Sequence, residues 1–131
     1  MDSEVLLVDE EEQFLKTLAR RPELSGFAVR TATAAGEASG FLQSQRVHVV
    51  VLGVPDEGEG FLELLREIKA AKPAAEVIML TNESSVDFSL RAMKLGAYDC
   101  LQKPTDITKL AEQITEVARR KRARAASVSK E

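Results

Sequence analysis

Three nearly continuous apolar runs constrain the fold of this chain more than any other feature: Val5 to Val8, Val47 to Leu52 and Val77 to Thr81. None of them alternates apolar with polar residues, as a strand with one wet face would. They predict strands buried on both faces of a parallel sheet, which helices must cover on both sides. Similar runs at 27–32 and 97–102 bring the expected number of strands to five.

Amphipathic segments fill the intervals and predict helices at 11–21, 34–45, 61–72 and 85–95 and from Thr105 onward, where the threonine hydroxyl is a candidate cap. Gly96 is expected to end the fourth helix. Gly36 and Gly40 each cost about 1 kcal/mol relative to alanine, so we expect a short or loosely packed second helix. The alternation predicts the α/β class, with a doubly wound five-stranded parallel sheet.

Charge divides the chain into two parts. Residues 119–131 hold six basic residues and one acidic residue, a net charge of +5, and residues 1–118 carry −8 of the total of −3. We therefore expect one domain at 1–118 and a basic tail or linker at 119–131. No recognition helix or interleaved aromatic residue accompanies the tail, so this chain alone is not expected to bind nucleic acid.

Other features of the sequence indicate the cellular compartment of the protein. The single cysteine, Cys100, cannot form an intramolecular disulfide. The N-terminus has no signal-peptide pattern, and no apolar stretch approaches the roughly 20 residues needed to span a bilayer. These features predict a cytoplasmic protein without a membrane segment.

The residues that follow the predicted strands belong together, because the carboxyl ends of parallel strands meet at one edge of the sheet. Asp9 and Glu10 follow the first strand, Gly53 the third, and Thr81 ends the fourth; Lys103 and Pro104 follow the fifth. Two acids, a hydroxyl and a lysine on one rim would suit a hard cation beside a phosphoryl group.

Three segments in this order resemble the response-regulator receiver family along nearly the whole predicted domain: VLLVDEE from Val5, VIMLT from Val77, and LGAYDCLQKP from Leu95. The resemblance implies a flavodoxin-like (βα)5 fold in three layers. It also implies that a histidine kinase donates a phosphoryl group to an aspartate that ends the third strand. Gly53 holds the place of that aspartate.

Glycine can neither form an acyl phosphate nor ligate a metal, so two functions are lost together. The loop at 54–60 is one residue shorter than is usual in the family, and the other possible register puts Leu52 at the acceptor position; neither residue is a carboxylate. Asp56 is the nearest surrogate acceptor, although it also suits a solvated acidic turn. With a ligand missing, Asp9 and Glu10 are expected to bind Mg²⁺ weakly or not at all and to pair with Lys103, and no other cofactor is expected.

The other pocket residues are assigned by resemblance. Thr81 corresponds to the switch hydroxyl, Lys103 to the phosphate-sensing lysine, and the bond before Pro104 to a cis peptide. Asn82 stands where a small residue is usual and is expected to fill part of the pocket. Cys100 replaces an inward-turning aromatic residue; a small buried cysteine and a redox sensor are its alternative interpretations.

These observations favour a pseudo-receiver: a bacterial-type signalling module, not an enzyme, that acts through protein contacts and not through its own aspartyl phosphate. The expected partners are a histidine kinase, an output domain or a second copy, bound by the helix at 85–95, the strand at 97–102 and the last helix. One alternative is a conventional receiver that is phosphorylated on a surrogate such as Asp56. Another is the regulatory domain of a longer transcription factor.

Overall fold

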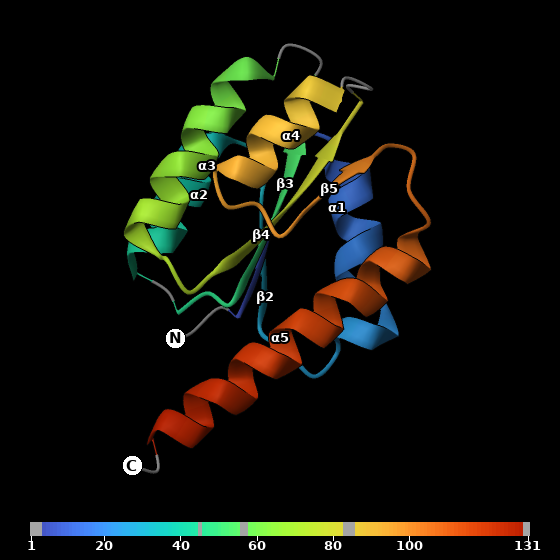
Figure 1. Ribbon diagram of the computed structural model, residues 1–131. Coiled ribbons are helices and arrows are strands. Elements are labelled where there is room, and N and C mark those ends of the chain that lie inside the picture. The colour runs from blue at the N-terminus through green and yellow to red at the C-terminus, as the bar shows by residue number, and fades with distance from the viewer. Residues whose placement is uncertain (1–3, 45, 56–57, 83–85, 130–131) are drawn as a thin grey trace.

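The computed structural model describes residues 4–44, 46–55, 58–82 and 86–129. Five parallel strands form one sheet in the order β2-β1-β3-β4-β5, with helices on both faces (Figure 1). The predicted α/β class and doubly wound topology are confirmed. In chain order the elements are β1 (Val5–Val8), α1 (Glu12–Ala19), the 3₁₀ turn η1 (Pro22–Leu24), β2 (Val29–Ala32), α2 (Ala35–Ser44), β3 (Val49–Val54), α3 (Glu59–Ala71), β4 (Glu76–Thr81), α4 (Val86–Lys94), β5 (Asp99–Gln102) and α5 (Ile107–Ser129).

The sheet separates two hydrophobic cores. Leu6 and Val8 point into a core covered by α2, α3 and α4, which contribute residues such as Leu65. Val5 and Leu7 point to the other face, where α1 and α5 cover the sheet. Successive side chains of a strand leave opposite faces, so a run that is buried on both faces has to be apolar throughout.

Gly53 lies inside β3 and not after it, which corrects the predicted strand end at Leu52. Backbone pairing with β4 continues through Gly53, opposite Leu80, and through Val54, opposite Thr81. A ladder of backbone hydrogen bonds needs no side chain, so a glycine does not end the strand. The acceptor position is therefore held within the sheet.

The predicted boundary at the end of α4 and the cis bond before Pro104 are confirmed, because Gly96 has φ of +105° and the Lys103–Pro104 peptide is cis. The predicted cap of α5 is wrong by one residue. Asp106 Oδ1 accepts hydrogen bonds from the backbone N–H of Thr108 (2.9 Å) and of Lys109 (3.1 Å), and so caps the helix in place of Thr105.

The second helix is not short, since α2 has 10 residues and buries Ala38 and Leu42. A Cβ added at Gly36 or at Gly40 would meet no atom within 4 Å. These glycines therefore lie on an open face of α2, where they lower the helix propensity.

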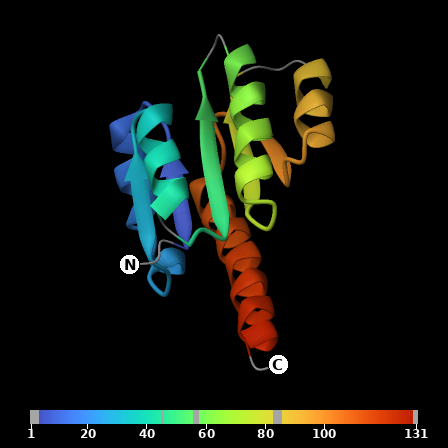
Figure 2. The same ribbon diagram turned by 90° about the vertical axis from the view of Figure 1, so that its left-hand side faces the viewer.

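The last helix, α5, is longer than we predicted from its apolar residues. It continues through the basic segment to Ser129 and projects beyond the sheet (Figures 1 and 2). Its basic side chains contact the amino ends of the strands: Arg120 Nη2 lies 2.8 Å from the Tyr98 hydroxyl, and Lys121 Nζ lies 3.5 Å from Glu76. The predicted tail thus begins as an ordered helix packed on the body. No described helix has the length and apolarity to cross a membrane.

Candidate functional site

The carboxyl edge of the sheet brings together four of the predicted residues, Asp9, Gly53, Thr81 and Lys103. Asp9 directly follows β1 and only 2% of it is exposed, and Lys103 directly follows β5. Gly53 lies in the neighbouring strand, β3. Residues that are far apart in the sequence therefore meet here because the parallel strands that carry them end at one edge.

Asp9 is fully engaged within the protein. Its Oδ2 lies 2.6 Å from Lys103 Nζ, and its Oδ1 accepts a 2.8 Å hydrogen bond from the backbone N–H of Glu11. The second contact fixes the turn that leads into α1. The predicted pairing of Asp9 with Lys103 is therefore present, whereas the second acid beside Lys103 is Glu11 and not the predicted Glu10.

Lys103 is held from several sides. Its ammonium lies 3.4 Å from Glu11 Oε1 and 5.1 Å from the centre of the Phe14 ring. Burial works to lower the pKa of Lys103, but the hydrogen bonds and charges of Asp9 and Glu11 outweigh it and raise the pKa. Lys103 is therefore a stable cation whose charge is balanced by the protein's own carboxylates.

Gly53 and Asp9 compete for the same space. A Cβ at position 53 would lie 1.9 Å from Asp9 Oδ2 and 2.4 Å from its Cγ. No side chain tolerates such contacts, so any residue larger than glycine at position 53 requires the Asp9 carboxylate to move. In this pocket, Asp9 occupies the volume in which a side chain from β3 would begin.

The other residues predicted for the site end or follow the neighbouring strands β4 and β5. Thr81 ends β4, is 1% exposed, and its carbonyl accepts a 2.8 Å hydrogen bond from the backbone N–H of Lys103. Asn82 and Pro104 are exposed. The exposure of Asn82 does not support the expectation that its side chain fills part of the pocket. The surrogate candidate Asp56 lies outside the described residues.

Cys100 is half-buried in β5, next to Met79 of β4. The Ser89 hydroxyl of α4 donates a hydrogen bond to its Sγ at 3.6 Å. The thiol therefore fills the space between β5 and α4, although it is less buried than the sequence suggested.

The acidic residues leave few oxygens free for a magnesium ion. Mg²⁺ needs near-octahedral oxygen coordination with carboxylate ligands. Glu10 is exposed, both oxygens of Asp9 are hydrogen-bonded, and position 53 supplies no ligand. In the described part of the chain no three His, Cys, Asp or Glu side chains are grouped to hold a metal ion.

A second cluster, centred on His48, was not predicted from the sequence. His48 is 8% exposed, and its Nδ1 lies 3.5 Å from Glu4 Oε2 without forming a hydrogen bond. Arg122 donates to both Glu4 oxygens and, at 2.8 Å, to the carbonyl of Gly26. Burial lowers the pKa of His48, more than the Glu4 charge raises it. Glu4 and Arg122 are 118 residues apart, so no local sequence pattern could have paired them.

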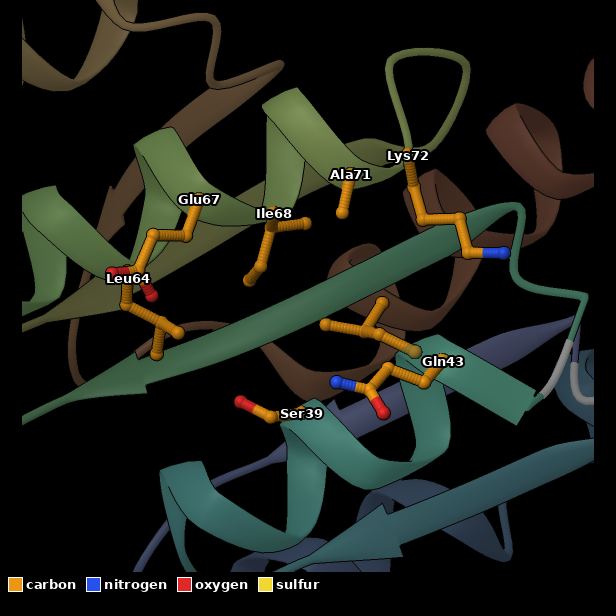
Figure 3. Close-up of a pocket in the computed structure, with 8 residues that line it drawn as sticks. Ser39, Gln43, Leu64, Glu67, Ile68, Ala71 and Lys72 are labelled. Carbon is orange, nitrogen blue, oxygen red and sulfur yellow. The ribbon is translucent and has the colours of Figure 1, made fainter.

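A hollow of about 380 Å³ lies between α2 and α3, away from the carboxyl edge of the sheet (Figure 3). Leu64, Ile68 and Ala71 of α3 face Ser39 and Gln43 of α2 across it. It contains none of the residues predicted for the site.

Comparison of the sequence with known protein families identifies a match over most of the chain. The family model described as the response regulator receiver domain matches residues 5–115. The chain belongs to the response regulator receiver family. Receivers are signalling modules, and the matched range contains Asp9, Gly53, Thr81 and Lys103.

Curated relatives of this receiver are longer regulators. It is 36% identical over 107 residues to the acid tolerance regulatory protein ActR of Rhizobium meliloti, covering 80% of this chain and 54% of that protein. It is 29% identical over 113 residues to the photosynthetic apparatus regulatory protein RegA of Cereibacter sphaeroides, covering 86% and 61%. The chain thus spans little more than half the length of these relatives.

Solved receivers share the fold. A CheY-like receiver domain from Methanospirillum hungatei superposes with a TM-score of 0.80 at 24% identity, over 95% of this chain and 99% of that one. A response regulator from Burkholderia pseudomallei, solved with a phosphorylated aspartic acid, a calcium ion and citrate, gives 0.72 at 28% identity, over 95% and 74%.

Proposed function

We propose that this receiver is a pseudo-receiver, which signals through protein contacts and not through a phosphoryl group of its own. The observation that carries the proposal is the arrangement at Gly53: the acceptor position has no side chain, and the Asp9 carboxylate, paired with Lys103 at 2.6 Å, occupies the adjoining space.

The chemistry of phosphorylation supports this proposal. An acyl phosphate forms only on a carboxylate that is free to attack phosphorus. Asp9, which is 2% exposed, uses one oxygen to hold Lys103 and the other to hold the Glu11 backbone. An incoming phosphoryl group would have to replace these bonds without a metal ligand at position 53 to balance its charge.

The charges around Lys103 also support the proposal. Lys103 has a raised pKa because its partners are anionic, so its positive charge is neutralised without phosphate. A partly buried cation that already has carboxylate partners gains less from a new anion than an unpaired one would. The pocket's scaffold then serves to join β1 to β5, and not to sense a modification.

The contact face is proposed to include α4. Val86, Leu90 and Met93 are 72%, 56% and 46% exposed, and their spacing of four and three residues places them on one side of the helix. On the same proposed face, a hollow of about 610 Å³ between β5 and α5 is lined mainly by polar residues such as Asp99 and Gln113. An apolar ridge beside a polar rim suits a protein partner.

The partners we propose are a histidine kinase, an output domain or a second copy. The curated relatives include transcriptional regulatory proteins such as AlgB of Pseudomonas aeruginosa, of which this chain covers 22%. That relationship supports a role as the regulatory part of a transcription factor.

Beryllium fluoride, which mimics a phosphoryl group on an aspartate, tests the pocket. We expect no saturable amide shifts at Thr81 or Lys103 when ¹⁵N-labelled protein is titrated with MgCl₂ and beryllium fluoride, while an ordinary receiver in the same buffer responds. Saturable shifts in this protein would favour the alternative, a conventional receiver with a surrogate acceptor such as Asp56.

Sedimentation velocity tests the contact face for self-association. If a second copy is the partner, Leu90→Asp should raise the concentration at which dimers form, and Thr17→Asp on the exposed side of α1 should not. A protein that is monomeric at every concentration would restrict the proposal to a kinase or an output domain.

A further inference from the structure

A small polar hollow lies at the opposite edge of the sheet from Gly53, where the amino ends of β4 and β5 meet α5. Its volume is about 90 Å³. Glu76 begins β4 and Tyr98 precedes β5; the other lining residues, Val117, Arg120, Lys121 and Arg124, belong to α5.

Hydrogen-bond donors outnumber acceptors in this hollow. Among the described lining residues, only Glu76 carries a carboxylate. Glu76 Oε1 lies 3.5 Å from Lys69 Nζ, and Glu76 Oε2 lies 3.5 Å from Lys121 Nζ. The Tyr98 hydroxyl accepts a 2.8 Å hydrogen bond from Arg120, so its own hydrogen remains to be donated. Arg124 extends the basic side of the hollow by one further turn of α5.

We propose that this hollow binds one tetrahedral oxyanion with the size and charge of phosphate. Among the lining residues three cationic side chains face the one carboxylate of Glu76, and Arg120 also lies 3.8 Å from Glu116 outside the hollow. Charge-assisted bonds from arginine and lysine to such an anion are among the stronger ones in proteins. A hollow of about 90 Å³ has room for a phosphate group.

The anion would connect two parts of the molecule. Arg120, Lys121 and Arg124 lie on the segment of α5 that passes the ends of the strands, and Tyr98 belongs to the sheet side. A shared anion would reduce the repulsion among the three cations and hold this segment against the sheet. Inorganic phosphate and the phosphate of a larger ligand share this chemistry.

Titration of the full chain with sodium phosphate, at constant ionic strength maintained with chloride, tests the site. We expect saturable ¹⁵N shifts at Tyr98, Lys121 and Arg124. The same titration with adenosine monophosphate distinguishes the sources: tighter binding than inorganic phosphate assigns the site to a phosphomonoester, and weaker binding assigns it to the free ion.

The matched variants are Arg124→Gln and Arg119→Gln, which remove the same charge from exposed positions of α5, although only Arg124 lines the hollow. Losing a charge-assisted bond at a partly exposed site should weaken phosphate binding roughly three- to tenfold in Arg124→Gln, and Arg119→Gln should stay close to wild type. Tyr98→Phe should weaken it in the same direction. Absence of saturation, or equal weakening by both arginine variants, would overturn the proposal.

Discussion

Asp9 and Gly53 are linked by exclusion: the Asp9 carboxylate, held 2.6 Å from Lys103 Nζ, lies 1.9 Å from the point where a Cβ at position 53 would be. The absence of a side chain at position 53 therefore allows the ion pair between Asp9 and Lys103 to form in its present geometry. The glycine at position 53 and the ion pair between Asp9 and Lys103 are two aspects of one arrangement.

Gly53→Ala should destabilise the protein by displacing Asp9 from Lys103. Disrupting a partly buried ion pair costs more than the small entropic gain of replacing glycine, so we expect a net loss of about 1 to 3 kcal/mol in the free energy of unfolding. Urea denaturation measures this change.

Two controls isolate the cause. Gly36→Ala, in open space on α2, should be neutral or stabilise by up to about 1 kcal/mol. In an Asp9→Ala background, Gly53→Ala should lose most of its penalty, because the clashing carboxylate is gone and only the Cβ of residue 9, at 3.0 Å, stays close. An equal penalty with and without Asp9 would show that the exclusion is not the cause.

Acidification should destabilise the protein through His48. Its pKa is lowered mainly by burial, so the unfolded chain binds the proton more readily. The stability that this group contributes is complete above its unfolded pKa of about 6.5 and is lost as the pH falls toward the folded pKa. Urea unfolding at about pH 7.5 and about pH 5.5 should show this loss in the wild type and a smaller one in His48→Gln. An equal loss in both proteins would assign the pH dependence to other groups.

The pKa of Glu4 is also lowered, chiefly by its hydrogen bonds from Arg122. Its contribution is present above its ordinary value of 4.5 and disappears at lower pH. The loss of stability from Glu4 therefore begins only below about pH 4.5, whereas the loss from His48 begins below about pH 6.5.

Arg122 should anchor the extension of α5. It donates to Glu4 and to the Gly26 carbonyl, and its guanidinium lies 4.4 Å from the centre of the Phe27 ring. Because the arginine is partly exposed, Arg122→Gln should cost only about 1 kcal/mol. Arg119→Gln, which has no such contacts in the described chain, should be close to neutral in the same urea unfolding experiment. A neutral Arg122→Gln would contradict the anchoring.

The fold was predictable because burial on both faces leaves a simple signal. Apolar runs such as Val77 to Leu80 have no polar positions, and few architectures cover both faces of a parallel sheet. The location of the site followed from the same reasoning, since the ends of parallel strands converge. Family resemblance supplied the expected cis bond before Pro104, which local pattern alone would not.

Other features depend on three-dimensional geometry that sequence patterns do not encode. The pairing of Asp9 with Lys103 was predicted because both follow strands that end at one edge, but the contact of Glu4 with Arg122, which spans 118 residues, was not. The continuation of β3 through Gly53 depends on pairing with β4, which tolerates a glycine. The basic segment after Ala118 was expected to be a tail because charge was considered without the acidic groups at the amino ends of the strands.

Intact-mass spectrometry tests the central claim most directly. The protein is incubated with Mg²⁺ and acetyl phosphate, beside an ordinary receiver as positive control, and weighed at intervals. We predict that the control gains one phosphoryl mass and that this protein gains none. A stable adduct of one phosphoryl group on this chain would contradict the account.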